Sequence, residues 1–194
     1  MKGQLIAFVG CMFSGKTTQL VTLTKKAEKE SRLFQCFKPK IDVRYAENGI
    51  VSHDKQSVKA QPVASAREIL TFLERTTEIV IVDEIQFFDQ SLIGVLQSLV
   101  WQGKVVYVAG LDTDWRGRPF GPVPEVLSIA TQVYRLQAEC SVCSQPAVRS
   151  QRIAQSEEDI FLGTNEYEPR CLQHFFVPNL EKTNNSQISL QAIT

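Results

Sequence analysis

The chain has 194 residues, with 21 lysines and arginines, 21 aspartates and glutamates, and a formal net charge of zero. This balance argues against a strongly electrostatic nucleic-acid binder, whose surface is usually basic. No apolar run approaches the length of a membrane span, and the N-terminus lacks a signal-peptide pattern, so we expect a cytoplasmic protein. The length allows one substantial core and a small appendage.

Short apolar runs alternate with helical patterns over the first two-thirds of the chain. The predicted strands are Gln4–Val9, Leu33–Phe37, Ile79–Val82, Val105–Ala109 and Val133–Leu136. The predicted helices are Lys16–Glu30, Ala66–Arg75, Leu92–Trp101 and Val123–Ile129. This alternation predicts an α/β fold with a mainly parallel sheet flanked by helices. Residues 38–60 are polar and show no clear periodicity, and a connection of this length is often functional.

Residues Gly10–Thr17 fit the pattern G-x-x-x-x-G-K-[ST] of a phosphate-binding loop, between a predicted strand and a predicted helix. Glycines let backbone N–H groups point at phosphate oxygens, and the helix dipole adds attraction. Lys16 would reach the β- and γ-phosphates, and the Thr17 hydroxyl would bind Mg²⁺. We therefore predict that ATP is bound by Gly10, Cys11, Met12, Phe13, Ser14, Gly15, Lys16, Thr17 and Thr18.

The aliphatic strand Ile79–Val82 ends in two carboxylates, Asp83 and Glu84. Ligands of open parallel sheets bind at the carboxyl ends of strands, so Asp83 would lie near the loop and hold Mg²⁺, directly or through water. Glu84 is open to two interpretations: it could polarise a water that hydrolyses the triphosphate, or accept a proton from a substrate hydroxyl. Position alone does not separate a hydrolase from a kinase.

Two C-x-x-[CH] pairs, Cys140 with Cys143 and Cys171 with His174, are separated by 27 residues. Three thiolates and one imidazole predict a closed, tetrahedral Zn²⁺ site of the structural type. Residues 144–170 contain too few apolar side chains for a core of their own, so metal binding would supply much of the folding free energy there. We expect Cys11 and Cys36 to be small buried residues, and His53 to be a surface residue.

The pattern changes after Glu139, where short polar pieces replace the alternation of strands and helices. We therefore expect a nucleotide-binding domain over residues 1–139 and a zinc-binding subdomain over residues 140–177. Residues 178–194 are polar, and we expect a disordered tail.

Taken together, the motifs resemble the type II thymidine kinase family, the cytosolic, zinc-containing class, over about residues 4–176. The features that carry the resemblance are Gly10–Thr17, residues 38–45 (KPKIDVRY), residues 83–88 (DEIQFF), Gly110-Leu111-Asp112, Arg118–Gly121 and the two zinc pairs. The resemblance implies a P-loop NTPase-type core of the RecA-like kind and a zinc subdomain with a lasso loop. It also implies transfer of the ATP γ-phosphate to thymidine, with deoxyuridine as a second substrate.

The resemblance assigns roles to individual residues. Glu84 matches the general base, Lys16 and Arg44 join it as catalytic residues, and Gln86 belongs to the nucleotide site. Asp42 and Arg44 match a pair near the transferred phosphate. The remaining substrate-site matches are Met12, Phe87, Leu111, Trp115, Phe120 and Ser150, together with Phe161, Leu162, Gly163, Thr164 and Tyr167 of the lasso. A homotetramer and feedback inhibition by dTTP are further implications.

The chain departs from the family pattern at four positions. Cys11 stands where a proline is usual, Ile85 where a small residue is common, and Trp115 where a smaller aromatic is frequent. Trp115 would narrow the base pocket. His174 replaces a cysteine, which zinc accepts.

Two other functions stay open from the residues themselves. The chain could be an ATPase whose zinc subdomain binds nucleic acid or a protein, or a triphosphate sensor without turnover. Glutamates and an aspartate offset the arginines of residues 144–170, which disfavours contact with phosphate backbones. The presence of both Lys16 and Glu84 argues against a sensor.

Overall fold

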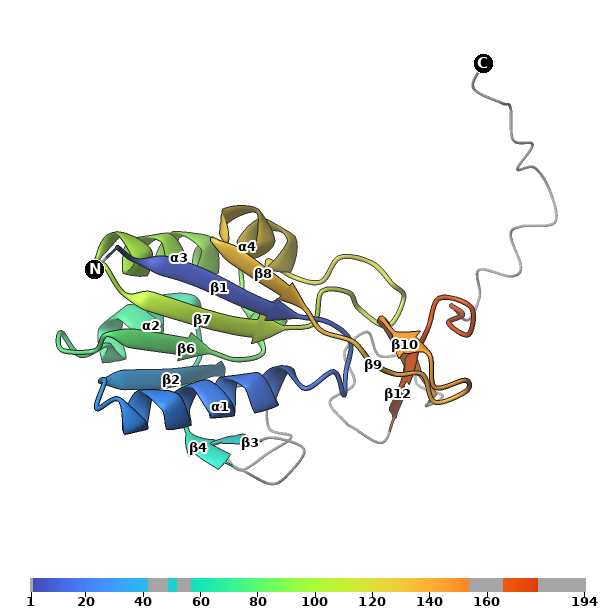
Figure 1. Cartoon of the computed structure of the whole chain (residues 1–194). Coiled ribbons are helices and arrows are strands. Elements are labelled where there is room, and N and C mark those ends of the chain that lie inside the picture. Colours follow the sequence, from blue (N-terminus) through green and yellow to red (C-terminus); the bar gives the residue numbers. More distant parts are fainter. Residues whose placement is uncertain (1, 42–48, 52–56, 154–165, 178–194) are drawn as a thin grey trace, which may run out of the picture.

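The computed structural model describes residues 2–41, 49–51, 57–153 and 166–177 (Figure 1). Its centre is a six-stranded sheet in the order β5-β2-β6-β7-β1-β8, and all of its strand pairs are parallel. The strands are β1 (Gln4–Val9), β2 (Phe34–Pro39), β5 (Gln61–Val63), β6 (Ile79–Val82), β7 (Val105–Gly110) and β8 (Gln132–Arg135). The predicted parallel α/β architecture is confirmed.

Helices cover both faces of this sheet. One face packs against α1 (Lys16–Lys29); the other packs against α2 (Ala66–Phe72), α3 (Ser91–Trp101) and α4 (Val123–Ile129) (Figure 1). Alternate residues of each strand supply the two cores, because successive side chains of a strand point to opposite faces. In β1, Ala7 belongs to the core under α3, and Phe8 to the core under α1.

The sequence did not predict the edge strand β5 or a short hairpin that lies beside α1. The short strand β5 contains Pro62, which breaks the strand pattern in the sequence and is tolerated because this strand lies at an edge. An antiparallel hairpin, β3 (Gly49–Val51) with β4 (Ser57–Lys59), lies within the stretch that showed no periodicity.

The helix α2 ends at Phe72, three residues before the predicted end at Arg75. A side chain from β2 explains the difference: the Gln35 amide donates to the Phe72 carbonyl oxygen at 3.0 Å and accepts from the Glu74 N–H at 2.8 Å. These contacts satisfy groups that would otherwise continue the helix, so a tertiary contact overrides the local helical preference.

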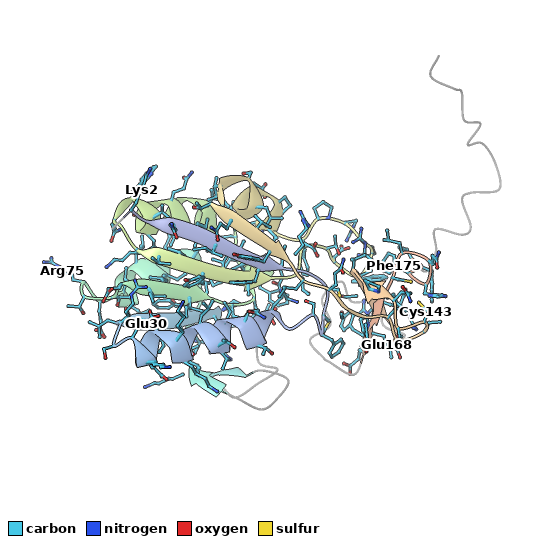
Figure 2. All side chains as sticks on the ribbon, viewed as in Figure 1. Lys2, Glu30, Arg75, Cys143, Glu168 and Phe175 are labelled. Carbon is cyan, nitrogen blue, oxygen red and sulfur yellow. The ribbon has the colours of Figure 1, made fainter. Side chains whose placement is uncertain are left out.

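A small lobe lies beyond the carboxyl end of the sheet (Figure 1). It is built from two short antiparallel pairs: β9 (Ala138–Glu139) with β10 (Pro146–Ala147), and β11 (Arg149–Arg152) with β12 (Tyr167–Arg170). Figure 2 shows Cys143, Glu168 and Phe175 gathered in this lobe, at the opposite end of the molecule from Lys2, Glu30 and Arg75. No helix in the described part of the chain combines the length and the apolar character that a membrane span needs.

Candidate active site and metal centre

The loop between β1 and α1 owes its shape to two glycines. Gly10 has φ 150°, and a Cβ built on it would lie 2.2 Å from the carbonyl oxygen of Leu136, so a larger residue would collide with backbone. Gly15 caps α1 in the left-handed conformation, with φ 82°. The loop therefore turns tightly from the strand into the first helical turn, where Lys16 and Thr17 begin α1.

The Lys16 ammonium lies inside this loop. It donates to the carbonyl oxygens of Gly10 at 3.0 Å and Cys11 at 2.7 Å, and the residue is 8% exposed. Burial lowers the pKa of Lys16 below its ordinary 10.5, while the nearby carboxylates, Glu84 foremost, act in the opposite direction. The side chain is a buried cation at the point where a phosphate-binding loop places its anion.

Thr17 and Asp83 lie side by side at the same point. The Thr17 hydroxyl donates to the Asp83 carboxylate at 3.3 Å, and Asp83 is buried at the end of β6. The crossover through the parallel sheet brings these oxygens together from residues 66 apart in sequence. Hydroxyl and carboxylate oxygens are the ligands that Mg²⁺ prefers, so the pair fits this ion.

Glu84 follows in an unusual backbone conformation, with φ 53° and ψ 43°, and its N–H donates to the Asp83 carboxylate at 2.8 Å. The Asp83 carboxylate accepts from Thr17, whereas the Glu84 carboxylate accepts from Gln86. The left-handed turn leads into the short 3₁₀ helix η1 (Ile85–Phe87). Left-handed conformations of residues other than glycine cost free energy and occur often at functional sites.

Gln86 holds the Glu84 carboxylate in place. Its side chain is 2% exposed, its Oε1 accepts from the Leu111 N–H at 3.0 Å, and its Nε2 donates to a Glu84 carboxylate oxygen. Because the Leu111 N–H must face an acceptor, the orientation of the amide is decided and the donor faces Glu84. The sequence placed Gln86 in the nucleotide site but showed no sign of this link to β7.

The structure brings several of the predicted substrate residues into pairs. Phe87 and Phe120 meet edge to face with ring centroids 5.7 Å apart. The Met12 N–H donates to the Ser150 hydroxyl at 2.9 Å, and the predicted Tyr167 lies opposite Arg152 in the β11–β12 pair. Aromatic walls of this kind suit a flat heterocycle.

Two arginines were missed beside Trp115. The guanidinium carbon of Arg116 lies 4.0 Å from the Trp115 ring centroid, and that of Arg152 lies 5.0 Å away. Arg116 is adjacent to Trp115 in sequence, but no sequence pattern predicted a contact between Trp115 and Arg152, which belongs to β11 of the small lobe. These cation–π contacts restrict the orientation of the indole.

Part of the predicted site lies outside the described residues. This holds for Asp42 and Arg44, for Phe161, Leu162, Gly163 and Thr164 of the lasso, and for His53.

The four predicted metal ligands converge in the small lobe. The ligand atoms of Cys140, Cys143, Cys171 and His174 all lie within 4.8 Å of one another. The Cys143 and Cys171 sulfurs are 3.8 Å apart, as are the Cys140 sulfur and the His174 Nδ1. Sulfurs bound about 2.3 Å from a tetrahedral ion lie about 3.8 Å apart, so the residues fit Zn²⁺.

The pKa of Cys140, in the metal centre, is shifted in the opposite direction from those of Cys11 and Cys36, whereas burial and the neighbouring Cys140 and Cys171 sulfurs raise the pKa of Cys143. Burial opposes ionisation of Cys140, but the N–H groups of Cys171, Val142 and Cys143 outweigh it and lower its pKa to about 5. Burial raises the pKa of Cys36 to about 12 and also raises that of Cys11. Cys140 therefore favours the thiolate that a metal requires, whereas Cys36 and Cys11 are buried, protonated thiols, as expected.

The buried lysine in its loop, with an acidic strand end beside it, places the chain among P-loop nucleotide-binding proteins of the α/β class. The family model for thymidine kinase matches residues 3–175, and the chain belongs to this family. A thymidine kinase from Bdellovibrio bacteriovorus is 43% identical over 175 residues, which cover 90% of this chain and 86% of that protein.

A thymidine kinase from a Rhodothermus species is 40% identical over 193 residues, covering 99% of this chain and 90% of that protein. Among solved structures, the Pif1 helicase from Candida albicans aligns with a TM-score of 0.44 and 14% identity over 69% of this chain and 36% of that chain.

The lowered pKa of Lys16 predicts that ATP binding weakens with rising pH at values below those of an ordinary lysine. Below its pKa the ammonium attracts phosphate, and above it that charge is lost. We expect the dissociation constant of an ATP analogue, measured between about pH 7 and pH 10, to increase on the alkaline side. Lys16→Arg keeps its charge over this range, so its profile should be flat; a flat profile for the unaltered protein would contradict the prediction.

Replacing Gln86 by methionine removes the donor to Glu84 and the acceptor for Leu111 at similar volume. We expect kcat to fall by about 10- to 100-fold, because one or two buried hydrogen bonds of roughly 1–2 kcal/mol each are lost at the carboxylate. ATP affinity should change little. Gln97→Met on α3 is the matched control, and equal kcat values for the two variants would exclude the positioning role of Gln86.

Cys140→Ser should remove the metal, because three ligands do not complete a closed tetrahedral site. We expect about one zinc per chain in the unaltered protein and much less in the variant, measured by elemental analysis of purified protein. Cys36→Ser is the control, since Cys36 lies outside the cluster. Full metal content in Cys140→Ser would refute the ligand assignment.

Proposed function

We propose that this chain transfers the γ-phosphate of ATP to the 5′-hydroxyl of thymidine, giving ADP and thymidine 5′-monophosphate. The match to the thymidine kinase family over residues 3–175 carries this proposal. The geometry supports it, since a carboxylate, Glu84, follows the buried Asp83 beside the phosphate-binding loop. Salvage of a deoxynucleoside for DNA synthesis is the corresponding role.

Phosphoryl transfer depends mainly on positioning and on neutralising charge. Lys16 and the loop N–H groups would stabilise the phosphates, with Cys11, Met12, Phe13, Ser14 and Thr18 completing the nucleotide site. Thr17 and Asp83 would hold Mg²⁺, which offsets phosphate charge when bound. Arg44 would add a guanidinium near the transferred phosphoryl group, and Asp42 would lie beside it.

Glu84 is the proposed general base. It would accept the proton of the sugar 5′-hydroxyl as that oxygen attacks the γ-phosphorus and the bond to the ADP oxygen breaks. Gln86 donates to one carboxylate oxygen of Glu84 and so fixes the orientation of the carboxylate toward the proposed substrate side. The Asp83 carboxylate accepts from the Thr17 hydroxyl, and the Glu84 carboxylate accepts from the Gln86 amide, so the two carboxylates have different partners.

The pyrimidine would lie among the aromatic and apolar residues Met12, Phe87, Leu111, Trp115 and Phe120, with Ser150 behind Met12. The lasso residues Phe161, Leu162, Gly163, Thr164 and Tyr167 would close over it. A closing segment keeps water from the phosphate, where hydrolysis would compete with transfer. Deoxyuridine lacks only the thymine methyl group, so we propose it as a second substrate.

We propose a structural zinc ion at Cys140, Cys143, Cys171 and His174, because four protein ligands leave no open position for a reacting water. The zinc subdomain would run from residue 140 to 177, after the nucleotide-binding domain of residues 1–139. A homotetramer and inhibition by dTTP extend the proposal from the family resemblance. The free thiols suit a reducing compartment, and we propose the cytoplasm.

Family membership does not favour the alternative of an ATPase whose zinc subdomain binds nucleic acid or a protein. Labelled ATP with magnesium, incubated with thymidine, with deoxyuridine and without nucleoside, separates the two. Label transferred to thymidine with little background hydrolysis would support the kinase. Hydrolysis at the same rate in all three mixtures would refute it.

Glu84→Gln should reduce kcat by about 100-fold or more, because general-base catalysis contributes about 10²- to 10⁴-fold. Binding of an ATP analogue should remain within about 3-fold of the unaltered protein, since Lys16 and Asp83 are retained. Glu68→Gln is the control, because Glu68 lies in the first turn of α2 and its carboxylate accepts from the Ala64 N–H rather than from the phosphate-binding loop. Normal turnover by Glu84→Gln would remove Glu84 from its role as base.

A further inference from the structure

The phosphate-binding loop contacts the zinc lobe through two consecutive residues. The Cys11 thiol donates to the Ala147 carbonyl oxygen at 3.3 Å, and the Met12 N–H donates to the Ser150 hydroxyl at 2.9 Å. Both contacts are buried, and they join residues 136 and 138 apart in sequence. The acceptors belong to β10 and β11, which are strands of the small lobe.

The Cys11 side chain is packed as well as hydrogen-bonded. It is 2% exposed and belongs to a small buried cluster with Ala147 and the two metal-ligand cysteines Cys140 and Cys171. The position of this thiol therefore depends on how the lobe is folded around its metal ligands. Cys36, the other thiol outside the metal centre, packs in the core under α1 instead.

The backbone of Cys11 is held from the opposite side by the catalytic lysine. The Lys16 ammonium donates to the Cys11 carbonyl oxygen at 2.7 Å and to the Gly10 carbonyl oxygen at 3.0 Å. Cys11 thus contacts the lobe with its side chain and the Lys16 ammonium with its carbonyl oxygen. A displacement of Ala147 in the lobe would therefore shift Cys11, and with it a carbonyl oxygen that binds the Lys16 ammonium.

We propose that Cys11 is a positioning residue that couples the zinc lobe to the phosphate-binding loop, so that the folded, metal-bound lobe increases the affinity of the loop for ATP. Met12 and Ser150 form the second half of this connection. The inference rests on the proposed use of ATP and goes beyond it, because it assigns the zinc lobe an effect on the nucleotide as well as on the nucleoside.

The test is equilibrium binding of a non-hydrolysable ATP analogue with magnesium, without thymidine, to the full chain. Cys11→Ala removes the donor, and we expect a 2- to 5-fold weaker affinity, since one modest hydrogen bond contributes roughly 0.5–1 kcal/mol. Cys11→Ser keeps a donor and should restore most of the affinity. Ser150→Ala should weaken binding to a similar degree. Zinc content, measured for every variant, should equal that of the unaltered protein.

Ser141→Ala is the matched control, because Ser141 lies in the same lobe and bonds to Glu168 and Pro169 rather than to the loop. It should bind the analogue like the unaltered protein. Zinc is then removed with a chelator, and the protein is exchanged into chelator-free buffer with magnesium before binding is measured. Zinc removal should weaken binding more in the unaltered protein than in Cys11→Ala, in which the hydrogen bond to the lobe is already lost.

Analogue affinity that is the same in Cys11→Ala and Ser150→Ala as in the unaltered protein would overturn the coupling. If the protein unfolds when zinc is removed, the affinities of Cys11→Ala and Ser150→Ala still test the coupling. Failure of Cys11→Ser to restore affinity would overturn the role of the thiol as donor. Absence of analogue binding by the unaltered protein would refute the proposed function itself, so the two failures are distinguishable.

Discussion

The burial of one cation, the Lys16 ammonium, organises the catalytic end of this molecule. A buried charge is costly unless polar groups surround it, and here the carbonyl oxygens of Gly10 and Cys11 do so. Nearby carboxylates at the ends of β6 and β7 favour the charged form of Lys16, against the burial that lowers its pKa. This arrangement requires a tight loop after β1, and hence glycine at position 10, where a Cβ would collide with the Leu136 carbonyl oxygen.

The parallel sheet makes this convergence possible. With β1, β6 and β7 parallel and adjacent in the order β6-β7-β1, their carboxyl ends meet at one edge. The phosphate-binding loop, the acidic pair and the 111–120 segment all leave the sheet there. Gln86 then joins the β6 and β7 ends, through Glu84 on one side and Leu111 on the other. The Glu84 carboxylate, the proposed general base, gains a fixed orientation from this buried amide.

The small lobe has too little apolar core to be stabilised by packing alone. Its strands are two to four residues long, and its apolar cluster is small, so packing alone supplies little stability. The four converging side chains Cys140, Cys143, Cys171 and His174 fit the proposed zinc ion, whose binding would hold such a piece in one shape. The lobe contributes Ser150 and Arg152 to the neighbourhood of Met12 and Trp115, two residues of the proposed substrate site.

The sequence by itself determined the features whose residues are close together in the chain. The phosphate-binding loop with its flanking strand and helix, the Asp83-Glu84 strand end and the two metal-ligand pairs each have a spacing that follows from their chemistry. Only the tertiary structure decided the contacts between distant segments. Gln86 turns toward Leu111, Arg152 approaches Trp115, Gln35 ends α2, and Cys11 bonds to Ala147. No local periodicity encodes these pairs, because each depends on strand order and on how the lobe folds back onto the sheet.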